Sequence, residues 1–206
     1  MFELPWFKKS ESKFPLYVGL DHDNLSLKRK ARRIVKKHGS KGKTLFIECP
    51  PLSSEEIATQ LKIDGSPFLH AIIQAKTSGM KVVFLDTHKL RKIIEGRAEK
   101  VYNPLNPPTD YEMRKWNFIV WNLREKWWHK ILKKAGPGDI IIMHQNHLKR
   151  ILPAIAGEKK VLYESKPNVP GKGSGPLTEK EVMALKKERI WDKKEQRKIK
   201  AELNKG

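Results

Sequence analysis

The sequence predicts an α/β fold in which a mostly parallel sheet is flanked by helices on both faces and followed by a basic C-terminal helical tail. Short apolar, β-prone segments alternate along the chain with amphipathic helical patterns, which is the arrangement of parallel α/β sheets. The 206 residues suffice for one such domain with an appendage. We expect a basic lead-in over residues 1–13, the α/β domain over 14–165, a linker over 166–176 and a charged helix over 177–206.

Five strands are predicted from short apolar segments that end in polar or turn-forming residues. They cover residues 14–20, 44–47, 81–85, 139–143 and 161–163. Helices are predicted to begin near residues 26, 53, 67, 88 and 109. Thr109 and Glu112 have the spacing of a capping box and open the longest helix, which should reach about residue 135. Residues 166–176 are rich in Gly, Pro and Lys, as expected for a linker.

The first predicted helix combines an apolar stripe with dense positive charge. Leu27, Ala31, Ile34 and Val35 recur at helical spacing, and lysines and arginines fill most of the other positions. The whole chain holds 43 Lys and Arg against 23 Asp and Glu, a net charge of +20 that favours nucleic acid or another polyanion as a partner. The candidate contacts in the basic runs are Lys28, Arg29, Arg32, Arg33, Lys36, Lys186, Lys187 and Arg197.

The sequence lacks the signatures of several classes of protein. There is no RNA-recognition signature, GXXG loop or zinc-finger spacing, and no Walker A loop between a strand and a helix. The first residues lack the apolar core of a signal peptide, no run approaches the ~20 apolar residues that span a bilayer, and Cys49 is the only cysteine. We therefore expect a cytoplasmic protein without membrane insertion. Trp121 and Trp128 lie seven residues apart, so core packing is favoured over base stacking for the tryptophan-rich helix.

Side chains suited to metal binding or acid–base chemistry follow four of the predicted strands. They are Asp21 and His22, then Glu48, then Asp86 and His88, and finally His144 and His147. Because the carboxyl ends of parallel strands meet at one edge, these side chains are expected to converge there. A mixed set of imidazoles and carboxylates suits Mn, Co, Fe or Zn. The alternative is that the aspartates cap the following helices and that the histidines are ordinary loop residues.

These positions resemble the motifs of the TraB/pheromone-shutdown and TIKI superfamily. The likeness rests on Gly19-Leu20-Asp21-His22 after the first strand, Glu48 closing the second, Arg124 on a late helix, and His147 after the fourth strand. It covers about residues 14 to 163, and His144 stands where the second motif has glycine. The resemblance implies a metal-dependent hydrolytic site with His22, Glu48 and His147 around the metal and Arg124 nearby. TIKI-like members are metalloproteases, while many TraB-like members have no settled activity.

Two functions are therefore predicted. The first is a metal-dependent hydrolase, with a peptide as a candidate substrate, in which Glu48 is a ligand or the general base. Arg124 would hold a substrate anion or stabilise an oxyanion, or instead form a structural ion pair with a carboxylate. The second is a nucleic-acid or ribonucleoprotein binder in which the enzyme-like site is vestigial.

Overall fold

The computed structural model describes residues 12–20, 27–53, 55–57, 59, 67–98, 108–163 and 177–204. The chain divides into two compact units, which we call the sheet unit and the helical unit. The sheet unit comprises Met1–Glu48, Ser54–Val83 and Leu132–Ser165. The helical unit comprises Cys49–Ser53, Phe84–Ile131 and Lys166–Gly206. The helix predicted near residue 53 lies largely outside the described residues.

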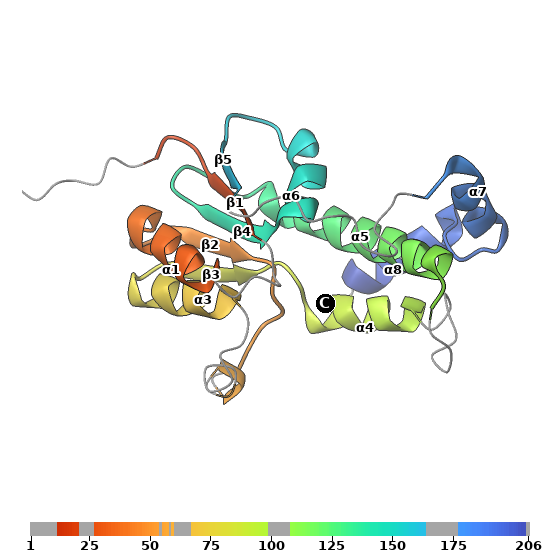
Figure 1. Ribbon diagram of the computed structural model, residues 1–206, viewed down its shortest axis with the longest axis horizontal. Coiled ribbons are helices and arrows are strands. Elements are labelled where there is room, and N and C mark those ends of the chain that lie inside the picture. Colours follow the sequence, from red (N-terminus) through yellow and green to blue (C-terminus); the bar gives the residue numbers. More distant parts are fainter. Residues whose placement is uncertain are drawn as a thin grey trace, which may run out of the picture. The chain divides into compact units, whose positions relative to one another are not determined.

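The sheet is parallel and five-stranded, in the order β3-β2-β4-β1-β5 (Figure 1). Its strands are β1 (Leu16–Leu20), β2 (Thr44–Ile47), β3 (Lys81–Phe84), β4 (Ile140–His144) and β5 (Lys160–Tyr163). The central strand β4 lies between β2 and β1, with Ile142 opposite both Ile47 and Val18. The predicted α/β fold with a mostly parallel sheet is confirmed, and each strand lies within two residues of its predicted bounds.

Both faces of the sheet are covered at β1, because all five residues of this strand are buried and successive strand residues point to opposite faces. Helices α1 (Leu27–His38) and α3 (Pro67–Thr77) pack against each other, and α6 (Gln145–Ile151), which runs into the 3₁₀ turn Leu152–Ala154, packs on β1. The predicted apolar stripe of α1 is buried at Ala31, Ile34 and Val35. Gly39 ends this helix at a close contact, since a Cβ there would lie 2.5 Å from the Met80 sulfur.

The helical unit contains α4 (His88–Ala98), α5 (Asp110–Leu132), α7 (Glu179–Lys187) and α8 (Lys193–Asn204). Its core joins residues from all four helices and from the turn before α8: Leu90, Ile119, Leu123, Leu185, Trp191 and Ile199. An ion pair between Arg97 and Glu195 also connects α4 with α8. In the C-terminal segment, where the sequence predicts one helix, the structure has two. The chain turns between them at Arg189, whose φ of 57° is left-handed, and the amides of Ile190 and Trp191 both donate to the Leu185 carbonyl.

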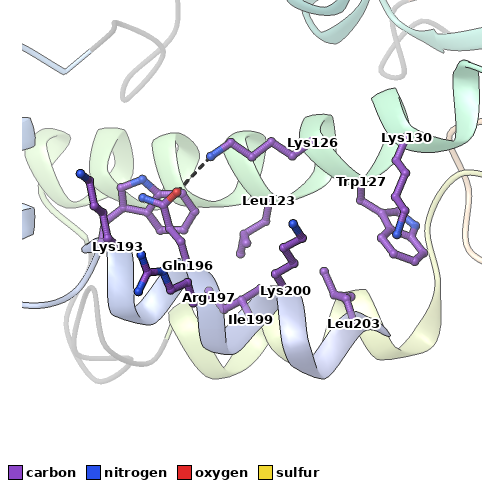
Figure 2. A pocket seen from close by; sticks show the side chains of 11 residues that line it. Leu123, Lys126, Trp127, Lys130, Lys193, Gln196, Arg197, Ile199, Lys200 and Leu203 are labelled. Carbon is purple, nitrogen blue, oxygen red and sulfur yellow. Dashed lines mark hydrogen bonds between the residues drawn. The ribbon is translucent and has the colours of Figure 1, made fainter. Parts of the chain in front are cut away.

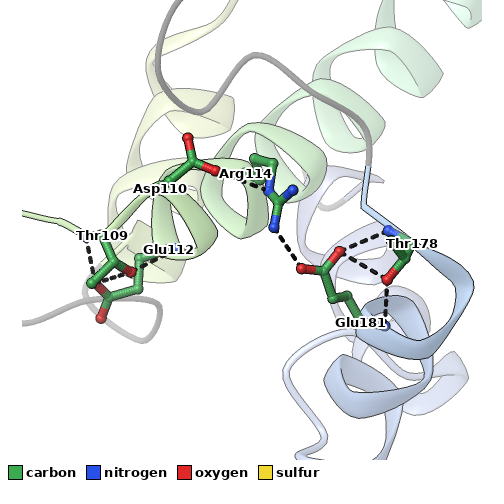
Figure 3. A network of polar contacts seen from close by, with 6 residues as sticks. All are labelled: Thr109, Asp110, Glu112, Arg114, Thr178 and Glu181. Atoms are coloured by element: carbon green, nitrogen blue, oxygen red, sulfur yellow. Dashed lines mark hydrogen bonds and ion pairs between the residues drawn. The ribbon is translucent and has the colours of Figure 1, made fainter.

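Two capping boxes begin helices of this unit and are linked by Arg114 (Figure 3). Thr109 and Glu112 form the box predicted for α5, with the Thr109 amide donating to Glu112 Oε2 at 2.8 Å. Thr178 and Glu181 form the same box at α7. Arg114 Nη2 lies 2.6 Å from Glu181 Oε1, so a side chain in the first turns of α5 contacts the first turn of α7. Among the described residues, no helix is long and apolar enough to cross a membrane.

Candidate functional site

Three of the predicted site residues meet at the carboxyl ends of β2 and β4, and we call Glu48, His144 and His147 the edge cluster. Glu48 is the residue after β2, His144 is the last residue of β4, and His147 lies in the first turn of α6. The Glu48 amide donates to the Ile142 carbonyl at 3.0 Å, which continues the β2–β4 pairing past the strand. The parallel pairing of strands about 95 residues apart therefore brings the edge cluster together.

The Glu48 carboxylate lies between the backbone of β4 and the imidazole of His147. Its Oε2 accepts a hydrogen bond from the His144 amide at 2.6 Å, and its Oε1 lies 3.7 Å from His147 Nε2. The side chains of Glu48 and His147 are 1% and 7% exposed. A carboxylate buried this deeply is costly unless hydrogen bonds or nearby polar groups compensate it, and the His144 amide supplies a hydrogen bond while the His147 imidazole lies beside it.

His144 has a second role in this cluster. It is the N-cap of α6, with Nδ1 accepting from the Asn146 amide at 3.2 Å, which leaves Nε2 on the far side of the ring. Its ring lies edge-on to that of His147, with 6.2 Å between the ring centroids. His144 thus fixes the start of the helix that carries His147.

Arg124 and Asp86 form an ion pair in the helical unit. Arg124 Nε and Nη2 donate to the two Asp86 oxygens at 3.2 and 2.7 Å, and Trp128 Nε1 donates to Asp86 Oδ1 at 3.0 Å. The guanidinium carbon lies 4.5 Å from the centroid of the Trp128 ring. This arrangement is the structural ion pair that the sequence analysis gives as the alternative to a role of Arg124 in substrate binding. It also shows that Asp86 does not cap α4, because the Leu90 amide bonds to Thr87 Oγ1 instead.

Trp128 is the partner that the sequence reasoning missed, because its indole was assigned to apolar packing alone. The available signal was spacing, since Arg124 and Trp128 are four residues apart and so share one face of α5. His88, a further candidate, is exposed in the first turn of α4. Asp21 and His22 lie outside the described residues, as does the side chain of Lys28. The end of β1 is described, and Leu20 pairs with His144 in the register.

The exposed side of α1 is a cationic face. It consists of Arg29, Lys30, Arg32, Arg33, Lys36 and Lys37, all exposed. Helix α1 contains no acidic residue, so none of these charges is neutralised within the helix. Arg32 Nε donates to Gln74 of α3 at 3.3 Å, a contact that leaves its charge in place. The three predicted contacts in the second basic run, Lys186, Lys187 and Arg197, are also exposed.

Comparisons of this chain with protein-family models, with curated proteins and with solved structures return no match. The TraB/TIKI resemblance therefore stays a prediction carried by the motif residues.

The side chains at the carboxyl edge of the sheet can be compared with the ligands that a metal ion needs. Among the described residues, no group of three or more His, Cys, Asp or Glu side chains is placed to share a metal ion. Glu48 and His147 are of the right chemical type and lie side by side. The third ligand expected from the resemblance, His22, follows two residues after β1, the strand that pairs with β4 next to this cluster.

Proposed function

We propose that this protein is a metal-dependent hydrolase of the TraB/TIKI type, with its site at the carboxyl edge of the parallel sheet. The observation that carries the proposal is the buried Glu48–His147 pair, in which Glu48 Oε1 and His147 Nε2 are 3.7 Å apart at the ends of two strands paired in the sheet. A buried carboxylate beside an imidazole is an arrangement used for metal binding and for acid–base chemistry.

In this proposal Glu48 and His147 would hold a divalent transition metal together with His22. The metal would lower the pKa of a bound water and polarise a carbonyl group of the substrate, with a peptide as the candidate. The protein's own contribution is positional. The His144 amide fixes one Glu48 oxygen, so the other is directed toward His147. Arg124 supports the fold through Asp86, and it is not assigned to the substrate.

The test is the metal content of the purified protein, measured for the wild type and for three variants at the proposed ligands. We expect about one Mn, Co, Fe or Zn ion per chain in the wild type and at least a tenfold loss of affinity in His22→Ala, Glu48→Gln and His147→Ala. His129→Ala, a half-buried histidine of α5, is the matched control and should keep the ion. Equal occupancy in all five proteins would reject the site. Loss of peptide hydrolysis in the same three variants would extend the proposal to catalysis.

A second function, binding of a nucleic acid or another polyanion, is favoured by the cationic face of α1. Six exposed cations lie on one helix that contains no carboxylate, and the net charge of +20 exceeds what solubility requires. This function does not depend on the edge cluster, because Ala31, Ile34 and Val35 hold the helix in place from its buried side. Affinity that falls steeply with salt is its expected signature.

A further inference from the structure

A groove between α5 and α8 of the helical unit belongs neither to the edge cluster nor to the cationic face of α1. It has a volume of about 510 Å³, which lies within the size range of small-molecule sites. Its walls are apolar and come from Leu123, Trp127, Trp191, Ile199 and Leu203. Figure 2 shows Leu123 reaching from α5 toward Ile199 on α8, with Trp127 and Leu203 at one end.

The rim of the groove is positively charged throughout. Lys126, Lys130, Lys193, Arg197 and Lys200 line it, all are exposed, and no acidic residue is among the described residues that line it. Lys126 Nζ donates to Gln196 Oε1 at 3.1 Å, as the dashed line in Figure 2 shows. Lys193, Arg197 and Lys200 form no ion pair with any residue in the described part of the chain. The groove thus combines an apolar interior with charge of one sign.

The tryptophan rings are poor platforms for nucleic-acid bases. Lys126 Nζ lies 5.6 Å from the centroid of the Trp191 ring, and Lys130 Nζ lies 5.6 Å from that of Trp127. Each ring therefore already has an ammonium group as its polar partner. Trp191 is only 4% exposed, so little of its face is open to a stacked base. An aliphatic chain needs only apolar wall area, which Leu123, Ile199 and Leu203 supply.

We propose that this groove is a binding site for a small aliphatic carboxylate, with the chain between α5 and α8 and the carboxylate among the lysines and arginine of the rim. The apolar walls contribute affinity that grows with chain length, by about fourfold for each methylene group that is buried. The rim sets the sign of the ligand's charge, because a cationic head group would meet five like charges. The site is independent of the proposed hydrolytic function.

The test is calorimetric titration of the full chain with dodecanoate below its micelle concentration. Dodecyltrimethylammonium, which carries a similar chain and the opposite charge, and acetate, which lacks the chain, are the ligand controls. We expect saturable binding of one dodecanoate, roughly fifteenfold weaker binding of decanoate, which has two methylene groups fewer, and no binding of either control. Equal binding of the two head groups would overturn the proposal. Binding of the protein to phosphatidylglycerol vesicles without binding of free dodecanoate would also overturn it, since that result would make the groove a membrane contact.

Because a protein of net charge +20 attracts anions everywhere, the variants need a control matched in charge. Lys126→Gln with Lys200→Gln removes two rim charges, and Lys76→Gln with Lys81→Gln removes two exposed charges from the sheet unit. We expect at least a fivefold loss of dodecanoate affinity in the first pair and less than a twofold change in the second. Gln196→Trp, which adds volume at the mouth without touching the core, should abolish binding. Equal losses in both pairs, or full affinity with Gln196→Trp, would place the ligand elsewhere and reject the groove.

Discussion

Asp86 is a buried carboxylate held by two side chains from the same helix. Replacing it in Asp86→Asn keeps one acceptor for Trp128 but leaves the Arg124 guanidinium, which is 20% exposed, opposite a neutral amide. We expect the free energy of unfolding to fall by about 2–3 kcal/mol, because an ion pair with two hydrogen bonds loses one partner. Denaturant unfolding followed by tryptophan fluorescence measures this. The exposed residue Glu158 supplies the control Glu158→Gln, which should change stability by less than about 0.5 kcal/mol.

A structural role for Arg124 also predicts how the losses of stability in single and double variants compare. If Arg124 acts through Asp86, the combination of Asp86→Asn with Arg124→Gln should destabilise the protein by less than the sum of the two single changes. Arg124→Lys keeps the charge but loses the fork that contacts both carboxylate oxygens, so it should also be destabilising. Additive effects of the two single changes would indicate that the residues act separately, and Arg124 would again be a candidate for substrate binding.

At the scale of the element, the capping box of α7 makes this helix sensitive to acid. The Thr178 backbone hydrogen bond, assisted by the Thr178 hydroxyl and Arg114, lowers the pKa of Glu181 from its ordinary value of 4.5. A carboxyl group whose folded pKa is lowered stabilises the fold above its unfolded pKa, and this stabilisation is lost as the pH falls through the lower folded value. We expect Glu181→Gln to reduce the loss of stability below about pH 4.5. Unfolding measured from pH 6 to 3 tests this, with Glu179→Gln in the same first turn as the control.

The elements themselves were largely predictable from local patterns. Five short apolar runs gave the strands, and the Thr109–Glu112 spacing marked the start of α5, because both signals act within a few residues of the chain. The turn between α7 and α8 was not predictable. Arg189 adopts a left-handed φ although no glycine stands there, and burial of Trp191 in the helical core is what favours the break. Tertiary packing overrode the local helical pattern at this point.

The candidate site was also predictable only in part, because its contacts join distant segments of the chain. The parallel direction of the strands was enough to predict that Glu48, His144 and His147 meet at one edge. The order β3-β2-β4-β1-β5 was not readable, since the pairing of β4 with both β1 and β2 depends on contacts between distant segments. For the same reason the sequence identified Asp86 and Arg124 as candidates but could not pair them, and it gave no sign of the groove between α5 and α8.

At the scale of the whole molecule, the net charge of +20 is distributed unevenly among the helices. Helix α1 has no acidic residue, whereas α7 contains Glu179 and Glu181 and α8 contains Glu195 and Glu202. Carboxylates interspersed among lysines weaken the local positive potential and repel phosphate groups. A polyanion should therefore contact α1 in preference to the basic residues of α7 and α8.

This preference can be measured through the salt dependence of binding to duplex DNA or RNA. One triple variant carries Arg29→Gln, Arg33→Gln and Lys37→Gln on α1, and the other carries Lys186→Gln, Lys187→Gln and Arg197→Gln; each lowers the net charge of +20 by three. If the α1 residues contact phosphates, the slope of log affinity against log salt should become less steep by roughly 2 to 3 in the first variant. The second variant should keep the wild-type slope, because its residues release no counterions on binding. Equal slopes in the two variants would show that the charge acts as a diffuse field, with no contact surface on α1, and affinity that is insensitive to salt in the wild type would exclude polyanion binding as a function.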